Sequence, residues 1–163
     1  MTRYRLAGCA MAVGAMVLAP AVAHAEPAPP EVGSACPADQ VDAMTLLPDE
    51  QTYVRCQEQF GSAFSWVAVQ TPFEPNDVWL SYGPAITLHG QGMRNPNLSS
   101  GQWTATPLDP ETVCSVTQTT VVEAGVLAQP VVSEGEPGEP LSVLMLPRLF
   151  YAELAGDCLW VKD

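Results

Sequence analysis

Short runs of hydrophobic and β-branched residues recur along the chain, and residues that favour turns separate them. Runs of this kind predict β-strands. They lie at residues 64–69, 78–82, 85–89, 102–106, 112–123, 141–146, 149–154 and 157–161. No long segment has the hydrophobic spacing of an amphipathic helix, although residues 37–47 allow one or two helical turns before Pro48 ends them. About seven to eight short strands predict a mostly β fold, an antiparallel β-sandwich or barrel.

The N-terminal segment at residues 1–25 has the three parts of a secretory signal peptide. Arg3 and Arg5 precede an apolar run at residues 6–18, and Ala23 and Ala25 supply the small residues before a cleavage site. The apolar run is shorter than the roughly 20 residues that a membrane-spanning helix needs. We therefore expect cleavage after Ala25, or after Ala23 as the alternative. The processed protein would have no stable membrane anchor and would be secreted or held in the cell envelope.

The remainder of the chain divides into a short tether and a folded part. Residues 26–35 are rich in proline and have no hydrophobic period, which predicts an extended tether. Residues 36–163 are predicted to form a single β domain, and they are numerous enough for a hydrophobic core. Within this domain, residues 133–140 consist of Gly, Glu, Pro and Ser and predict a surface loop.

The charge of the chain is strongly acidic. Asp and Glu number 18 against 6 Lys and Arg, for a formal net charge of −12 at pH 7. The predicted signal carries two arginines and no acid, so its removal takes the charge from −12 to −14. The cations that stay are Arg55, Arg94, Arg148 and Lys162. A field of this sign repels nucleic acids and anionic lipid head groups, so neither is an expected partner.

The cysteine pattern predicts two disulfides. Cys9 lies within the predicted signal, which leaves Cys36, Cys56, Cys114 and Cys158. An even number of cysteines in an exported chain favours disulfides, for which three pairings exist here. We favour Cys36–Cys56 with Cys114–Cys158, because the segment between the first two can fold back and the second pair would tie the last strand into the sheet. A zinc site is not expected, since no two of these cysteines are closer than 20 residues.

Four short motifs lie around the first two of these cysteines. They are Gly33-Ser34-Ala35-Cys36, Leu47-Pro48-Asp49, Tyr53-Val54-Arg55-Cys56 and Trp66. This arrangement over residues 33–66 resembles small exported actinobacterial proteins, including mycobacterial ones. The resemblance implies secretion and a local disulfide. It transfers no chemistry and no catalytic residue.

Several aromatic residues lie in predicted strands, namely Trp66, Trp79, Tyr82, Trp103, Phe150, Tyr151 and Trp160. If they are buried they anchor the core, and if they share an exposed sheet face they form a stacking platform for sugar rings. The strand at residues 78–82 distinguishes these cases, because Trp79 points away from its hydrophobic neighbours. Either both faces of this strand are covered or Trp79 is exposed.

No motif in the sequence assigns a catalytic residue, a metal or a cofactor. A serine hydrolase needs a base beside its nucleophile, and His89 is the single histidine beyond the predicted signal. A glycosidase needs two carboxylates a few ångströms apart, and no pair stands out among the acids. A small secreted hydrolase that uses carboxylates or His89 is an alternative hypothesis. A carrier of apolar ligands, with an internal cavity lined by Val, Leu and Met, is another.

The segment at residues 90–101 is the strongest candidate for a binding loop. It is long and rich in Gly and Asn, and with the preceding His89 it collects Arg94, Asn95 and Asn97. The guanidinium of Arg94 can bind a carboxylate or an anionic sugar through two hydrogen bonds. In the alternative interpretation Arg94 pairs with one of the protein's own acids and pins the loop. We hypothesise a non-enzymatic binding or interaction module of the cell envelope or extracellular medium, whose partner is a protein or a glycan.

Overall fold

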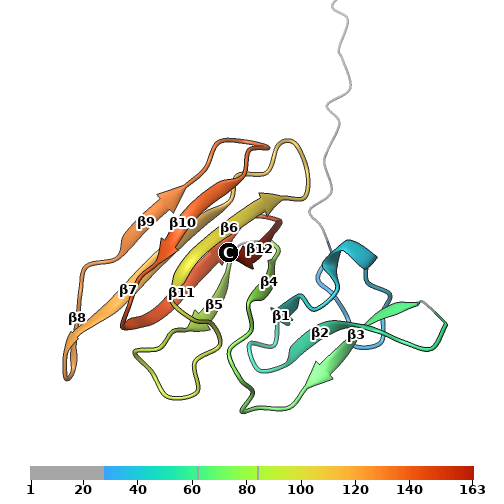
Figure 1. The fold of residues 1–163 in the computed structure, drawn as a ribbon, viewed down its shortest axis with the longest axis horizontal. Coiled ribbons are helices and arrows are strands. Elements are labelled where there is room, and N and C mark those ends of the chain that lie inside the picture. The colour runs from blue at the N-terminus through green and yellow to red at the C-terminus, as the bar shows by residue number, and fades with distance from the viewer. Residues whose placement is uncertain (1–27, 62, 84) are drawn as a thin grey trace, which may run out of the picture.

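Two β-sheets make up most of the part of the chain that the computed structural model describes, which is residues 28–61, 63–83 and 85–163 (Figure 1). Its elements are the 3-10 helix η1 (Ala38–Gln40) and the strands β1 (Met44–Leu46), β2 (Tyr53–Glu58), β3 (Phe64–Val69), β4 (Val78–Ser81), β5 (Ile86–His89), β6 (Gly101–Pro107), β7 (Ser115–Glu123), β8 (Val126–Leu127), β9 (Val131–Glu134), β10 (Leu141–Met145), β11 (Leu149–Ala155) and β12 (Cys158–Lys162). The mostly β fold is confirmed. The predicted signal at residues 1–25 lies outside the described residues.

The larger sheet has seven strands in the order β10-β6-β12-β4-β1-β2-β3. Its neighbours are antiparallel except β1 and β4, which are parallel and share the register pair Met44 and Trp79. The smaller sheet has the order β5-β11-β7-β8, and β9 also pairs with β7. Figure 1 shows β6 and β10 over β7 and β11, with β1, β2 and β3 extending to one side. The arrangement is a β-sandwich over the larger part of the fold.

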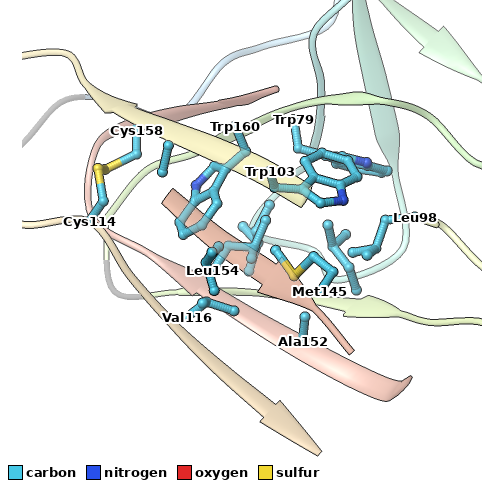
Figure 2. Packing of buried hydrophobic residues seen from close by; sticks show 14 of the residues in the cluster. Trp79, Leu98, Trp103, Cys114, Val116, Met145, Ala152, Leu154, Cys158 and Trp160 are labelled. Carbon is cyan, nitrogen blue, oxygen red and sulfur yellow. A yellow bond between two sulfur atoms is a disulfide. The ribbon is translucent and has the colours of Figure 1, made fainter. Parts of the chain in front are cut away.

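The main hydrophobic core lies between the two sheets (Figure 2). Three tryptophans on adjacent strands of the larger sheet, Trp79, Trp103 and Trp160, are at most 1% exposed. They face Leu88, Val116, Leu149, Ala152 and Leu154 of the smaller sheet. Truncating a buried aromatic of this size to Ala costs about 3–5 kcal/mol, so these three side chains account for much of the packing energy.

A second, smaller core lies against β4, β2 and β3. Its members are Cys36, Ala43, Val54, Cys56, Trp66 and Leu80. On β4, Trp79 therefore belongs to the main core while the neighbouring Leu80 belongs to this one. Both faces of β4 are covered, and all four tryptophans are buried. The stacking platform of exposed tryptophans is ruled out.

Both predicted disulfides are confirmed. Cys36 pairs with Cys56 at a Cα–Cα distance of 5.9 Å, and Cys114 pairs with Cys158 at 6.0 Å. The first joins the segment before η1 to β2. The second joins the residue before β7 to the start of β12, within the main core (Figure 2). Two disulfides are consistent with an oxidising, extracellular location.

The segment predicted as helical turns at residues 37–47 contains a short 3-10 helix and a strand. The 3-10 helix η1 has three residues, and β1 follows over Met44–Leu46. All three residues of β1 are buried between β2 and β4, so pairing on both sides overrides the local helical tendency. Sequence reasoning also missed β2, β8 and β9. Because β9 covers Val131–Glu134, part of the predicted loop at residues 133–140 is strand.

Hydrogen-bonded structure begins before Cys36, inside the predicted tether. The Gly33 N–H donates to the carbonyl of Trp66 at 2.7 Å, and the Trp66 N–H donates to the carbonyl of Ser34 at 2.9 Å. Ala35 and Ser65 form an antiparallel bridge. This segment therefore covers part of the outer edge of β3. In the part of the chain that the structure describes, no helix is long and apolar enough to cross a membrane.

Candidate functional site

The loop between β5 and β6 is closed by hydrogen bonds between His89, at the end of β5, and Asn97, within the loop. The Asn97 N–H donates to the carbonyl of His89 at 2.8 Å, and the His89 N–H donates to Oδ1 of Asn97 at 2.7 Å. Gly90 lies against β11, where an added Cβ would be 2.5 Å from Cβ of Leu149. The sequence therefore needs glycine at this position and an amide side chain at Asn97 to hold the loop in this conformation.

A hollow of about 580 Å³ lies beneath this loop, and we call it the loop hollow. Its lining residues are Tyr53, Thr71, Pro72, Phe73, His89, Met93, Arg94, Asn95 and Asn97. The four residues that the sequence indicated, His89, Arg94, Asn95 and Asn97, all line it. The volume is within the range of pockets that hold small molecules.

The hollow has an aromatic wall that is tied to the main core. The rings of Tyr53 and Phe73 meet edge to face with centroids 5.0 Å apart, and Tyr53 also meets Trp79 at 6.1 Å. The hydroxyl of Tyr53 donates to Oδ1 of Asn97 at 3.4 Å. Burial raises the pKa of Tyr53 and this hydrogen bond opposes the rise, so the hydroxyl is neutral at physiological pH. The wall is a fixed apolar surface with one polar atom.

The charge of the loop hollow is opposite to that of the chain as a whole. None of its lining residues is Asp or Glu. Arg94 is exposed and has no hydrogen-bond or ion-pair partner among the described residues. By contrast, Arg55 pairs with Asp42 at 2.9 Å, Lys162 pairs with Asp77 at 3.6 Å, and Arg148 donates to the carbonyl of Val122 at 2.7 Å. Arg94 therefore does not pin the loop to an acid in the described structure.

The four predicted residues divide into two roles by burial. Asn97 is 6% exposed, and its Oδ1 accepts both from His89 and from Tyr53, so it shapes the hollow. Asn95 is exposed in the left-handed backbone region with φ 52°, a conformation that asparagine tolerates. Together with Arg94 and His89, it is available to a ligand.

A second hollow, of about 730 Å³, adjoins the first, and we call it the strand hollow. Its lining residues are Ala28, Pro29, Leu46, Leu47, Pro48, Glu50, Tyr53, Tyr82, Gly83, Ala85, Ile86, Thr87 and His89. Tyr53 and His89 line both hollows. The sequence did not indicate Tyr53, Phe73 or Glu50 as binding residues, because these residues share no binding motif.

The linings of the two hollows do not contain a pair of carboxylates or a histidine that is hydrogen-bonded to a nucleophile. The two linings contain one carboxylate, that of Glu50, whereas a glycosidase needs a pair. The His89 ring has no hydrogen bond to a hydroxyl or carboxylate among the described residues, and these residues form no group of three or more potential metal ligands.

The strand hollow includes Leu46, Leu47 and Ile86 but also Glu50, Thr87 and His89, so its lining is mixed. The sequence matches no protein-family model and no curated protein, and no solved structure matches the chain.

Proposed function

We propose that the protein is an exported, non-enzymatic binding module of the cell envelope or extracellular medium, and that its ligand presents a carboxylate to Arg94 in the loop hollow. One observation carries this proposal. In a chain of net charge −12, an arginine without a partner in the described structure lines a hollow that contains no acid. A guanidinium so placed offers two parallel N–H donors to a carboxylate.

The other lining groups fit a ligand that is part polar and part apolar. Phe73, Pro72 and Tyr53 supply an apolar wall, while Asn95 and His89 supply hydrogen-bonding groups at the rim. Small-molecule sites commonly combine apolar walls with a few placed polar groups. Both expected partner classes can present such a group, a protein through a side chain or C-terminus and a glycan through an acidic sugar.

Export is supported by the leader and by the cysteines. The predicted signal peptide, the resemblance to small exported actinobacterial proteins and the two disulfides each favour a location outside the cytoplasm. The two motifs Gly33–Cys36 and Tyr53–Cys56, on which the resemblance rests, end at the two cysteines of the first disulfide.

The test is an NMR titration of the processed protein with glucuronic acid and with N-acetylphenylalanine, two carboxylates with different scaffolds. We expect shifts in the side chain of Arg94 and in the amides of the loop. Arg94→Gln should abolish these shifts and leave the thermal midpoint unchanged. Arg148→Gln is the matched control, because Arg148 is exposed and lines neither hollow.

Two outcomes would overturn the proposal. One is that both carboxylates cause the same NMR shifts in the loop amides of Arg94→Gln as in those of the wild type. The other is that Arg94→Gln lowers the thermal midpoint by several degrees and binds as the wild type does, which would make Arg94 a structural residue.

A further inference from the structure

Two residues, Tyr53 and His89, line both hollows, and they come from different sheets. Tyr53 begins β2 in the larger sheet, and His89 ends β5 in the smaller one. Each hollow has the volume of a pocket for one small molecule. A ligand that contacts Tyr53 and His89 from both sides would occupy both hollows. Such a ligand would have to be an extended chain rather than one compact small molecule.

The strand hollow contains a charge opposite to that of Arg94, which is the charge of Glu50. Glu50 lines the strand hollow and not the loop hollow, it is exposed, and its carboxylate has no partner among the described residues. Its neighbour Asp49 is occupied, since its carboxylate accepts from the N–H groups of Gln51 and Thr52 and from the Thr52 hydroxyl. These bonds lower the pKa of Asp49. Asp49 thus stabilises the turn, while Glu50 is available.

Besides their charged and polar groups, both hollows have apolar and aromatic lining residues. Leu46, Ile86 and Tyr82 line the strand hollow, and Phe73 lines the loop hollow beyond the shared Tyr53. A carboxylate-bearing chain without a cation would meet repulsion from Glu50, and a cationic chain without a carboxylate would meet repulsion from Arg94. The groove favours a ligand with both charges separated by an apolar middle.

We infer that the two hollows form one groove for a short peptide, with the peptide's free carboxylate on Arg94 and an ammonium group on Glu50. This inference rests on the proposed function, because it adds a second charge and a length to the same carboxylate site. The hydroxyl of Thr87 and the ring of His89 lie along the groove and can bond peptide amide groups.

The probes are N-acetylated peptides that contain one lysine, a run of alanines of varied length and a C-terminal phenylalanine with a free carboxylate. The matched peptide has norleucine in place of lysine. An oligogalacturonate, which has carboxylates and no cation, represents an acidic glycan. Affinity is measured by calorimetry on the processed full chain, because Ala28 and Pro29 form part of the groove.

We expect the lysine peptide of the best length to bind about two- to fivefold more tightly than its norleucine match, as a partly exposed ion pair allows. Glu50→Gln should remove this preference and keep carboxylate binding. Thr87→Trp, at an exposed position of the strand hollow, should do the same by filling it. Glu58→Gln is the control for loss of negative charge, since Glu58 is exposed and lines neither hollow.

Two results would overturn the inference while leaving the proposed function standing. One is binding that depends on Arg94 but is the same for the lysine and norleucine peptides. The other is binding of the oligogalacturonate that is tighter than that of every peptide, which would assign the site to an acidic glycan. If no carboxylate probe binds in an Arg94-dependent way, the proposed function itself fails.

Discussion

The side chain of Asn97 and the backbone of His89 are joined by a hydrogen bond of 2.7 Å, which closes the loop that carries Arg94. A second bond, from the Asn97 N–H to the His89 carbonyl at 2.8 Å, runs between the same two residues. The position of Arg94 over the loop hollow therefore depends on a buried amide three residues further along the chain.

The first prediction follows from that amide. Asn97→Ala leaves the His89 N–H and the Tyr53 hydroxyl without their acceptor, so the free energy of unfolding should fall by about 1–3 kcal/mol. Urea denaturation measures the loss. Asn95→Gly is the control, because glycine adopts the left-handed conformation of Asn95 and no side-chain bond is lost among the described residues. Equal stability of the two variants would contradict the structural role of Asn97.

The second prediction concerns Ser81 and Trp160, both fully buried. The Ser81 hydroxyl donates to the Gly156 carbonyl at 2.7 Å and accepts from Nε1 of Trp160 at 2.9 Å. Ser81→Ala should lower the free energy of unfolding by about 1–3 kcal/mol. Trp160→Phe should cost less in the Ser81→Ala background than in the wild type, because the shared bond is already absent. Strict additivity in the denaturation data would show that this bond contributes nothing.

The third prediction is a pH dependence at Asp157. Burial, and then the charge of Asp109, raise the pKa of Asp157 above its ordinary value of 3.8. The folded state binds this proton more strongly than the unfolded state, so the associated stability is full below 3.8 and is lost as pH rises through the folded pKa.

Asp157→Asn should therefore raise stability at neutral pH by up to about 0.5 kcal/mol, after allowance for solvent screening of a partly exposed group. It should have no effect below pH 3.8. Calorimetric melts at the two pH values measure both effects, with Glu123→Gln as an exposed control. A variant that is less stable than the wild type at neutral pH would contradict the prediction.

The fourth prediction compares the two disulfides. The loops they close span 20 and 44 residues, which in the chain-entropy model gives about 3 and about 4 kcal/mol. Cys114 and Cys158 also lie in the main core, fully buried. Replacing both with Ala should therefore cost more than replacing Cys36 and Cys56 with Ala. Urea denaturation of the two double variants decides the order, and the opposite order would show that the smaller core depends more on its disulfide.

The fold class could be predicted because each strand has a local sequence pattern. The disulfide pairing could be predicted because few pairings of four cysteines are possible. Runs of hydrophobic and β-branched residues mark strands such as β7 and β11, and four cysteines allow three pairings. The strand β1 could not be predicted, since Met44, Thr45 and Leu46 are all buried and show no alternation. Its strand conformation depends on β2 and β4, which pair with it on either side.

The candidate site was predictable only in part. Arg94 drew attention through the scarcity of cations, and Asn95 and Asn97 through the composition of their loop. The other walls come from Tyr53 at the start of β2, Phe73 after β3 and Glu50 in the turn after β1, which the sheet brings together. Such long-range placement depends on strand order, and strand order has no local signature in the sequence.

The place of β12 in the larger sheet has a consequence for how the chain is made. Synthesis runs from the N-terminus, and β12, at Cys158–Lys162, emerges after every other strand described. Yet β12 lies between β4 and β6, so those two strands face an open gap until it arrives. The disulfide between Cys114 and Cys158 likewise cannot form until Cys158 has been synthesised. The larger sheet, and with it the main core, can therefore be completed only after β12 has been synthesised.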